Sequence, residues 1–383
     1  MDVNQRILLE LIGLSQYSTK TERRLDVNWD EIYIEATQQS VLGIIVPVVP
    51  KEIGSSEKWK QFSYRQMASY IRYCYAEDNL TQILKDSSVP FAILKGNSAA
   101  INYMDPSKRA MGDIDFIVSN EDFESAKDTL ISHGYKRVSE NSRNPRHIEF
   151  TKNGTSFELH RKFSHDDVDI EEYIIDGLNN LRIGKIEDHE FPMLPKLANG
   201  LVFLDHMRNH LKSGLGLRQA VDWMMYVYRE LNDEFWEKGF SRVAKEKKMD
   251  TLAIVATRMC QIYMGLPETI TWCKDADEEL CEQLMENLLT SGNFGRKQGS
   301  GNSVEFVSTH MKSQGTFRWL QKMGEYNWVT YHKHHWLKPF CWIYQGIRYA
   351  RKGFKTGRNR KQLSDDLNRS EQRYELLKKL GIE

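Results

Sequence analysis

The stretch 89–163 constrains the fold most, because there the chain changes from a helical to a strand-rich pattern. Before and after it, apolar residues recur at helical spacing. Within it, short runs rich in β-branched and aromatic residues alternate with one or two helical segments, which is typical of a sheet unit. We therefore predict an α+β fold with a mixed sheet and flanking helices. The predicted parts are a helical lead-in packed on the core (1–86), the core sheet unit (87–165) and a mainly helical C-terminal domain (166–383).

The dipeptide Asn153-Gly154 predicts a β-hairpin inside the sheet unit. The segments HIEFTK and TSFELHRKF flank it, and Asn-Gly readily adopts the positive φ angles of a two-residue turn. Counting outward from that turn predicts five cross-strand pairs: Lys152–Thr155, Phe150–Phe157, Glu149–Glu158, Ile148–Leu159 and His147–His160. Histidine and glutamate side chains then share one face, and apolar side chains share the other.

Two aspartates stand two residues apart in the segment GDIDFIV, which is typical of a strand. Asp113 and Asp115 should therefore project from the same face, where their charges repel unless something positive lies between them. Mg²⁺ (or Mn²⁺) is a suitable partner, since it prefers oxygen ligands and often binds carboxylates together with substrate phosphates. A third acid on a neighbouring strand would complete a two-metal site, and Glu158 is the candidate, with Glu149 as its rival. A D-x-D pair alone also occurs in sugar-nucleotide-binding enzymes, in calcium loops and on solvated strands.

At this point the residues resemble a known family. The segments LKGNSAAINYMDPSKRAMGDIDFIV and HIEFTKNGTSFELHRKF lie within residues 94–163. They are similar to the polymerase-beta-type nucleotidyltransferase superfamily, and specifically to an uncharacterised bacterial branch with LKG, R-x-x-GDID and ELH patterns. The resemblance implies a mixed sheet with flanking helices, Asp113 and Asp115 as the metal-binding pair, and Glu158 as the third acid.

The turn after the first strand and two cations are the remaining candidates for nucleotide binding. The resemblance implies that Gly96 begins the turn where the triphosphate approaches the backbone. This chain has Gly96-Asn97-Ser98 in place of the superfamily's usual Gly-Gly or Gly-Ser pair. Ser98 is also placed to cap a short helix. Lys95 and Arg109 flank the acids and are suited to offset phosphate charge, the alternatives being a strand-end lysine and a surface arginine.

The sequence leaves the roles of four histidines undecided. His147 and His160 should lie beside the acids, where an imidazole can shuttle a proton or bind the acceptor, or can simply form a cross-strand polar pair. His206 and His210 are four residues apart on a predicted helix, without the glutamate of a zinc-protease motif. They are expected to pack or to line the acceptor site.

Charge and cysteine content bound the cellular setting. Fifty-three basic and 53 acidic residues cancel, which argues against a protein whose whole surface grips nucleic acid or an anionic membrane. Five scattered cysteines without a CxxC pair indicate reduced thiols. The sequence has neither a secretory signal pattern nor an apolar stretch of membrane-span length, so we expect a cytoplasmic protein.

The segment 339–361 has seven basic residues and no acid. It is suited to weak contact with an anionic surface or RNA, or to an amphipathic helix covering the second domain.

These features favour an enzyme that moves a nucleoside monophosphate from an NTP to a hydroxyl, phosphate or protein acceptor and releases pyrophosphate. Two alternatives stay open at this stage. One is a non-catalytic scaffold that binds nucleotide, RNA or a partner. The other is a toxin-like enzyme that nucleotidylates tRNA or protein.

Overall fold

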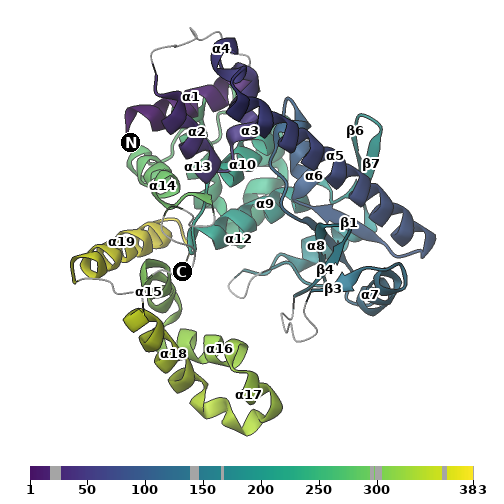
Figure 1. The fold of residues 1–383 in the computed structure, drawn as a ribbon, viewed down its shortest axis with the longest axis vertical. Helices are drawn as coiled ribbons and strands as arrows, with labels where there is room; N and C mark the ends of the chain where they lie inside the picture. Colours follow the sequence, from purple (N-terminus) through teal and green to yellow (C-terminus); the bar gives the residue numbers. More distant parts are fainter. Residues whose placement is uncertain are drawn as a thin grey trace.

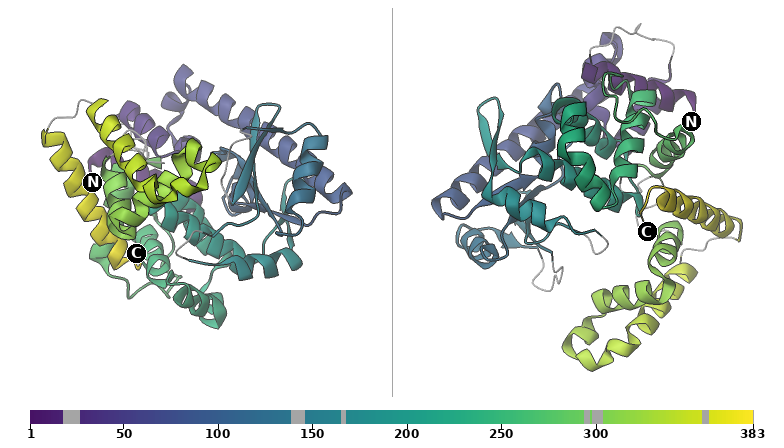
Figure 2. Two further views of the ribbon diagram at one scale, coloured as in Figure 1. Left: turned by 90° about the horizontal axis from the view of Figure 1, so that it is seen from below. Right: turned by 180° about the vertical axis from the view of Figure 1, so that it is seen from behind.

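The structure is a computed structural model, and it describes residues 1–17, 27–138, 146–164, 168–293, 297, 304–355 and 360–382. A helical body lies beside a sheet, and a helical lobe from the C-terminal part of the chain projects away from both (Figure 1). The view from behind in Figure 2 shows the same projection. Among the described residues, no helix combines the length and the hydropathy needed to cross a bilayer.

Seven strands form one mixed sheet in the order β3-β4-β5-β2-β1-β7-β6. Strand β2 is parallel to β5 and β1 is parallel to β7, whereas the other neighbours are antiparallel. The mixed sheet with flanking helices confirms the predicted fold class. The strand bounds are β1 Phe91–Leu94, β2 Ile114–Val118, β3 Lys136–Arg137, β4 His147–Lys152, β5 Thr155–His160, β6 Arg182–Ile186 and β7 His189–Met193.

The β4–β5 hairpin has the predicted register in all five pairs. Asn153 and Gly154 adopt φ angles of 51° and 74°, which are the left-handed values that a two-residue hairpin turn requires. Since side chains alternate along a strand, this register places His147, Glu149, Glu158 and His160 on one face of the hairpin.

The chain after Asp166 is mainly helical, as predicted, but it also contributes strands β6 and β7 to the sheet, which were not predicted. Residues 182–193 form a second antiparallel hairpin, and Met193 of β7 pairs with Ile93 of β1. Pro192 lies in β7, an interior strand, although proline cannot donate to the ladder. Burial of Phe191 and Met193 against the sheet core outweighs that local signal.

One face of the sheet is covered by α5 and α7 (Phe123–Ser132). Leu80 and Leu84 of α5 pack there with strand residues such as Phe116 and Phe157. Asn28 caps helix α2, since its side chain accepts a hydrogen bond from the Glu31 amide. The N-terminal helices are α1 Val3–Tyr17, α2 Trp29–Gln38, α3 Leu42–Ile45, α4 Lys51–Gly54 and α5 Glu57–Asp86.

The opposite face of the sheet meets the helical body. Ala92, Leu94 and Ile117 point to this side and belong to the same apolar core as α8, α9 and α10. Because Asp113 and Asp115 alternate with the apolar residues of β2, they point to this side too. The helices of the body are α8 Glu171–Asn179, α9 Lys196–Leu211, α10 Leu217–Glu230, α11 Asp233–Phe235, α12 Ser241–Glu246, α13 Asp250–Met264 and α14 Glu278–Ser291.

The C-terminal helices attach to the body through α15 and α19. Arg373 of α19 lies buried and pairs with Glu305 of α15 at 2.7 Å. It also donates to the Ser291 hydroxyl at the end of α14. The bounds are α15 Val304–Gln314, α16 Thr316–Asn327, α17 Val329–Lys333, α18 Cys341–Lys355 and α19 Arg360–Lys379, with a 3₁₀ helix at His335–Phe340.

Candidate active site

Three carboxylates converge at the centre of the sheet. Asp115 on β2 is directly opposite Glu158 on the parallel strand β5, and Asp113 precedes Asp115 by two residues. One carboxylate oxygen of each acid lies within 4.8 Å of those of the other two. Asp115 is buried, whereas Asp113 and Glu158 are partly exposed to solvent. Glu149, the rival third acid, lies on β4 opposite Glu158 and outside this group.

Asp115 is held in its charged form by two hydrogen-bonded partners. Its Oδ1 lies 2.8 Å from Lys95 Nζ and 3.0 Å from His160 Nε2. Burial acts to raise the pKa of Asp115, but the Lys95 charge and the His160 hydrogen bond outweigh burial and lower that pKa. The same contacts raise the pKa values of Lys95 and His160 against the opposing effect of burial.

The repulsion among the three carboxylates acts most visibly on Asp113. The negative charge of Asp115, followed by burial, raises the pKa of the Asp113 carboxyl to about 6. Within the described part of the chain, no hydrogen bond to the Asp113 carboxylate is present. The donor set therefore fits a divalent metal ion, since three carboxylate oxygens in reach of one another repel until a cation joins them.

Two histidines adjoin Glu158 on the same face of the hairpin. His160 Nε2 lies 3.2 Å from Glu158 Oε2, and His147 Nδ1 lies 3.9 Å from the same oxygen. Burial lowers the pKa of His147, so its imidazole is largely neutral near pH 7. His147, Glu158 and His160 also form a group whose ligand atoms lie within 4.8 Å of one another.

The turn after β1 is strained and faces the acids. Lys95 has φ 49° and ψ −128°, a backbone conformation that side-chain-bearing residues rarely adopt, and Gly96 follows with φ 36°. Ser98 is buried, and its hydroxyl donates to the Lys95 carbonyl at 2.8 Å. Asn97 is also buried, and its amide donates to Glu77 of α5 at 3.2 Å. These contacts fix the turn that presents the Lys95 ammonium to Asp115.

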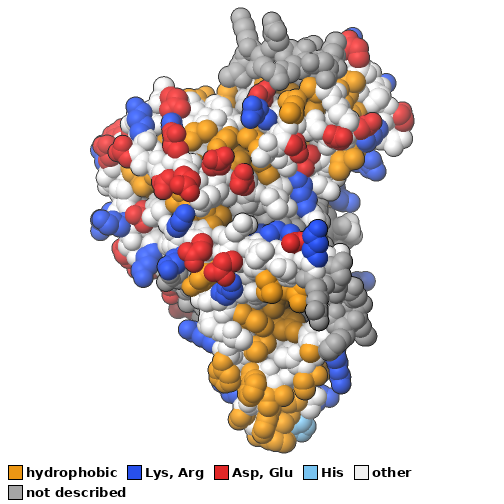
Figure 3. Space-filling view, turned by 90° about the vertical axis from the view of Figure 1, so that its left-hand side faces the viewer, with side chains coloured by type: hydrophobic (Ala, Val, Ile, Leu, Met, Phe, Trp, Pro, Cys, Tyr) orange, Lys and Arg blue, Asp and Glu red, His pale blue; other side chains and the backbone are white. Residues whose placement is uncertain are grey.

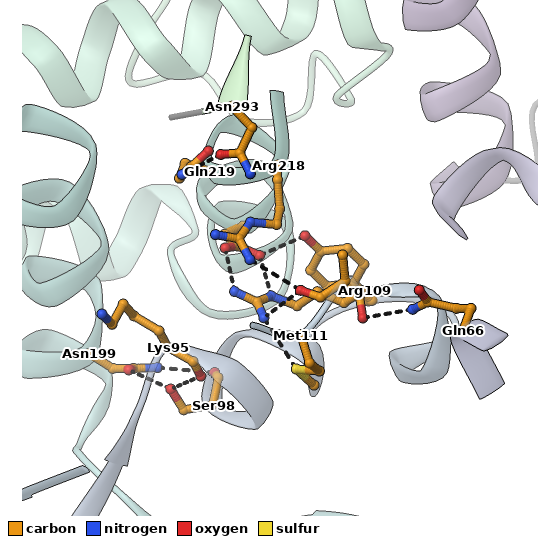
Figure 4. A network of polar contacts seen from close by, with 12 residues as sticks. Gln66, Lys95, Ser98, Arg109, Met111, Asn199, Arg218, Gln219 and Asn293 are labelled. Atoms are coloured by element: carbon orange, nitrogen blue, oxygen red, sulfur yellow. Dashed lines mark hydrogen bonds and ion pairs between the residues drawn. The ribbon is translucent and has the colours of Figure 1, made fainter. Parts of the chain in front are cut away.

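The loop that leads into Asp113 is held in place by contacts with α5 on one side and α10 on the other. On one side, the Tyr73 hydroxyl of α5 donates to the Gly112 carbonyl. On the other side, the buried Arg109 guanidinium forms a bidentate pair with Asp222 of α10, at 2.7 and 2.8 Å. Figure 4 shows Arg109 and Arg218 close together in this network.

Arg218 and Asp222 were not among the predicted site residues, and they lie in the helical region after the sheet unit. Arg218 Nη1 donates to the Ala110 carbonyl at 3.2 Å, and its positive charge lowers the pKa of Asp113. The available signal was a pair of charges four residues apart in α10, a helix that is otherwise largely apolar. Arg109, predicted to offset phosphate charge, has its guanidinium held by Asp222, behind the loop.

His206 of α9 lies near the Lys95 and Arg218 cations. Burial and then the neighbouring His210, Lys95 and Arg218 lower the pKa of His206 well below its usual value. Its ring lies 4.4 Å from that of His210, centroid to centroid. Lys95 and Arg218 thus come from two separate elements to the region beside Asp113, and His206 lies near both cations.

Comparison with known families gives one match. Residues 26–265 match the model of a family described as uncharacterised nucleotidyltransferase. The matched span covers more than half of the 383 residues and includes every acid and cation of this site. None of the curated proteins matches the chain.

Proposed function

We propose that this chain, which belongs to the uncharacterised nucleotidyltransferase family, transfers a nucleoside monophosphate from an NTP to an acceptor in a metal-dependent reaction that releases pyrophosphate. The observation that carries the proposal is the convergence of Asp113, Asp115 and Glu158 beside the Lys95 ammonium. Three carboxylates so close together lower the stability of a fold through mutual repulsion unless a bound cation neutralises their charge.

The three acids would hold Mg²⁺ or Mn²⁺. Such an ion would neutralise charge on the triphosphate and on the transferring phosphoryl group. Lys95 and Arg218 offset phosphate charge from the sides of the site, whereas Arg109 is paired with Asp222 and fixes the loop before Asp113. The Gly96-Asn97-Ser98 turn lies next to Lys95 and would contact the triphosphate through its backbone.

The chemical step is displacement at the α-phosphorus. The acceptor oxygen forms a bond to that phosphorus, the bond to the β-phosphate oxygen breaks, and pyrophosphate leaves with the electron pair. The acceptor proton must go to a base. Glu158 positions or deprotonates the acceptor, and the neutral His147, 3.9 Å from Glu158, can receive the proton.

We further propose that the sheet unit (87–165) is the catalytic core and that the following helical region lines the acceptor side. Arg218 of that region supports this division, since its charge acts on Asp113 from the helical body, and His206 lies near Arg218 and Lys95. The N-terminal helices would act as a support, because α5 binds the loop before Asp113.

The test is a transfer assay with matched variants. Purified protein is incubated with each labelled NTP, Mg²⁺ or Mn²⁺, and a cell extract as the acceptor source, and pyrophosphate and labelled products are measured. Asp113→Asn and Glu158→Gln should abolish transfer. Glu149→Gln is the control, because Glu149 lies on the adjacent strand outside the acidic group. Transfer that survives Glu158→Gln but not Glu149→Gln would contradict the assignment of the third acid. Binding of NTP without pyrophosphate release would favour the scaffold instead.

A further inference from the structure

The tip lobe, defined as residues 316–351, exposes an unusual amount of apolar surface. Trp336 is 71% exposed, Val329 is 70% exposed and Phe317 is 63% exposed. Helix α18 adds Ile343 and Ile347, one turn apart on one side. Figure 3 shows apolar side chains gathered over the projecting end of the molecule. Large exposed apolar patches on a soluble domain usually mark an interaction site.

The tip lobe has a packed interior of its own, so its exposed apolar residues are not core residues left without packing partners inside the lobe. Gly324 of α16 approaches the Cys341 carbonyl so closely that a Cβ at Gly324 would lie 2.0 Å from that oxygen. Trp328 stacks on Tyr344 with ring centroids 5.0 Å apart, and Gln345 is buried between the helices. The apolar residues on the outside are therefore presented on a formed helical hairpin.

The charge of the tip lobe differs from that of the whole chain. The chain is neutral, but the tip lobe has one acid, Glu325, and six lysine or arginine residues. Four of the basic side chains are exposed in the same helices and turns as the apolar residues: Arg318, Lys322, Lys333 and Lys338. Exposed tryptophan and isoleucine flanked by lysine is the composition of segments that lie in a membrane interface.

We propose that the tip lobe docks on the surface of an anionic lipid bilayer. Trp336 and the exposed side of α18 enter the interfacial region, and the flanking lysines and arginines bind the negative head groups. Long basic side chains suit this position because their apolar stems extend along the interface while the charge stays in water. The proposal does not depend on the nucleotidyltransferase site, and the tip lobe lies outside the matched residues 26–265.

The chemistry of the patch favours lipid over RNA. Nucleobases bind proteins by stacking on aromatic faces in a basic groove. The aliphatic Val329, Ile343 and Ile347 offer no such stacking, yet they are among the exposed residues. Acyl chains, in contrast, accept aliphatic and aromatic side chains alike.

The test is co-sedimentation of the full chain with vesicles. We expect binding to phosphatidylcholine vesicles that contain phosphatidylglycerol, and much weaker binding to pure phosphatidylcholine. Trp336→Ser combined with Ile343→Ser and Ile347→Ser should lower the partition coefficient by about tenfold or more, because binding scales with buried apolar area. Lys333→Gln with Lys338→Gln should lower it about fivefold per charge on anionic vesicles only.

Controls separate this proposal from misfolding and from the proposed function. Ile175→Ser with Ile183→Ser removes two exposed isoleucines elsewhere and should leave vesicle binding unchanged. Asp113→Asn should also bind vesicles normally. The proposal is overturned if anionic vesicles do not retain the protein, or if the triple variant binds them as the wild type does. It is equally overturned if the triple serine variant keeps vesicle binding and its one effect is to dissociate a dimer. The same holds if the double lysine variant keeps vesicle binding and its one effect is to lose RNA binding.

Discussion

Replacing Asp113 by asparagine should stabilise the metal-free protein, although the same change should abolish its activity. The reason is the repulsion among Asp113, Asp115 and Glu158, which the fold maintains in the absence of a cation. Asparagine has nearly the same shape as aspartate and removes one of the three charges.

The magnitude follows from the shifted pKa of Asp113. Its rise from 3.8 to about 6 corresponds to about 3 kcal/mol of destabilisation once the carboxyl is ionised. Because Asp113 is partly exposed, water screens some of this repulsion, and we expect Asp113→Asn to gain about 1–3 kcal/mol in the free energy of unfolding.

The gain should depend on pH with a definite sign. A carboxyl whose pKa is raised in the fold destabilises the protein above that pKa, and this cost fades as the pH falls towards the unfolded value. The difference between Asp113→Asn and the wild type should therefore be full above about pH 7, shrink through pH 6 and vanish below about pH 4.

Urea unfolding in the presence of a chelator, repeated across this pH range, measures the effect. Adding Mg²⁺ or Mn²⁺ should stabilise the wild type and not the variant, since a ligand bound only to the folded state stabilises it. A metal-free Asp113→Asn protein that is less stable than the wild type at neutral pH would refute the reasoning. It would mean that Lys95 and Arg218 already compensate the charge of Asp113.

Three further changes test other parts of the structure. Arg109→Met removes the bidentate guanidinium from the buried Asp222, whose Oδ1 still accepts from the Tyr103 hydroxyl, and should cost about 3–5 kcal/mol in urea unfolding, and Arg109→Lys should not restore the bidentate pair. Asn153→Ala should lower stability by about 1–2 kcal/mol because alanine resists the left-handed turn, whereas Asn153→Gly should be nearly neutral in a thermal melt. The raised pKa of His160 makes its contribution to stability full below 6.5, and that contribution is lost as the pH rises through the folded value. His160→Gln should therefore cost more in urea unfolding at about pH 6 than at about pH 9.

Local patterns in the sequence determined the β4–β5 hairpin and the face of the hairpin on which its glutamates lie. Asn153-Gly154 specifies a two-residue turn, and the alternation of side chains then orders every pair outward to His147 and His160. The placement of Asp113, just before β2, on the same side as Asp115 follows from the same period of two. These features need only residues close together in the chain, so a single sequence contains the information.

Only the tertiary structure decided which elements meet around the acids. The parallel pairing that sets Asp115 against Glu158 depends on how two strands pack, and the hairpin of β6 and β7 becomes part of the sheet only by joining β1. Asp222 reaches Arg109 from a helix more than a hundred residues later in the chain. Contacts between segments so far apart are selected by the burial of whole elements and leave no short spacing that could be read beforehand.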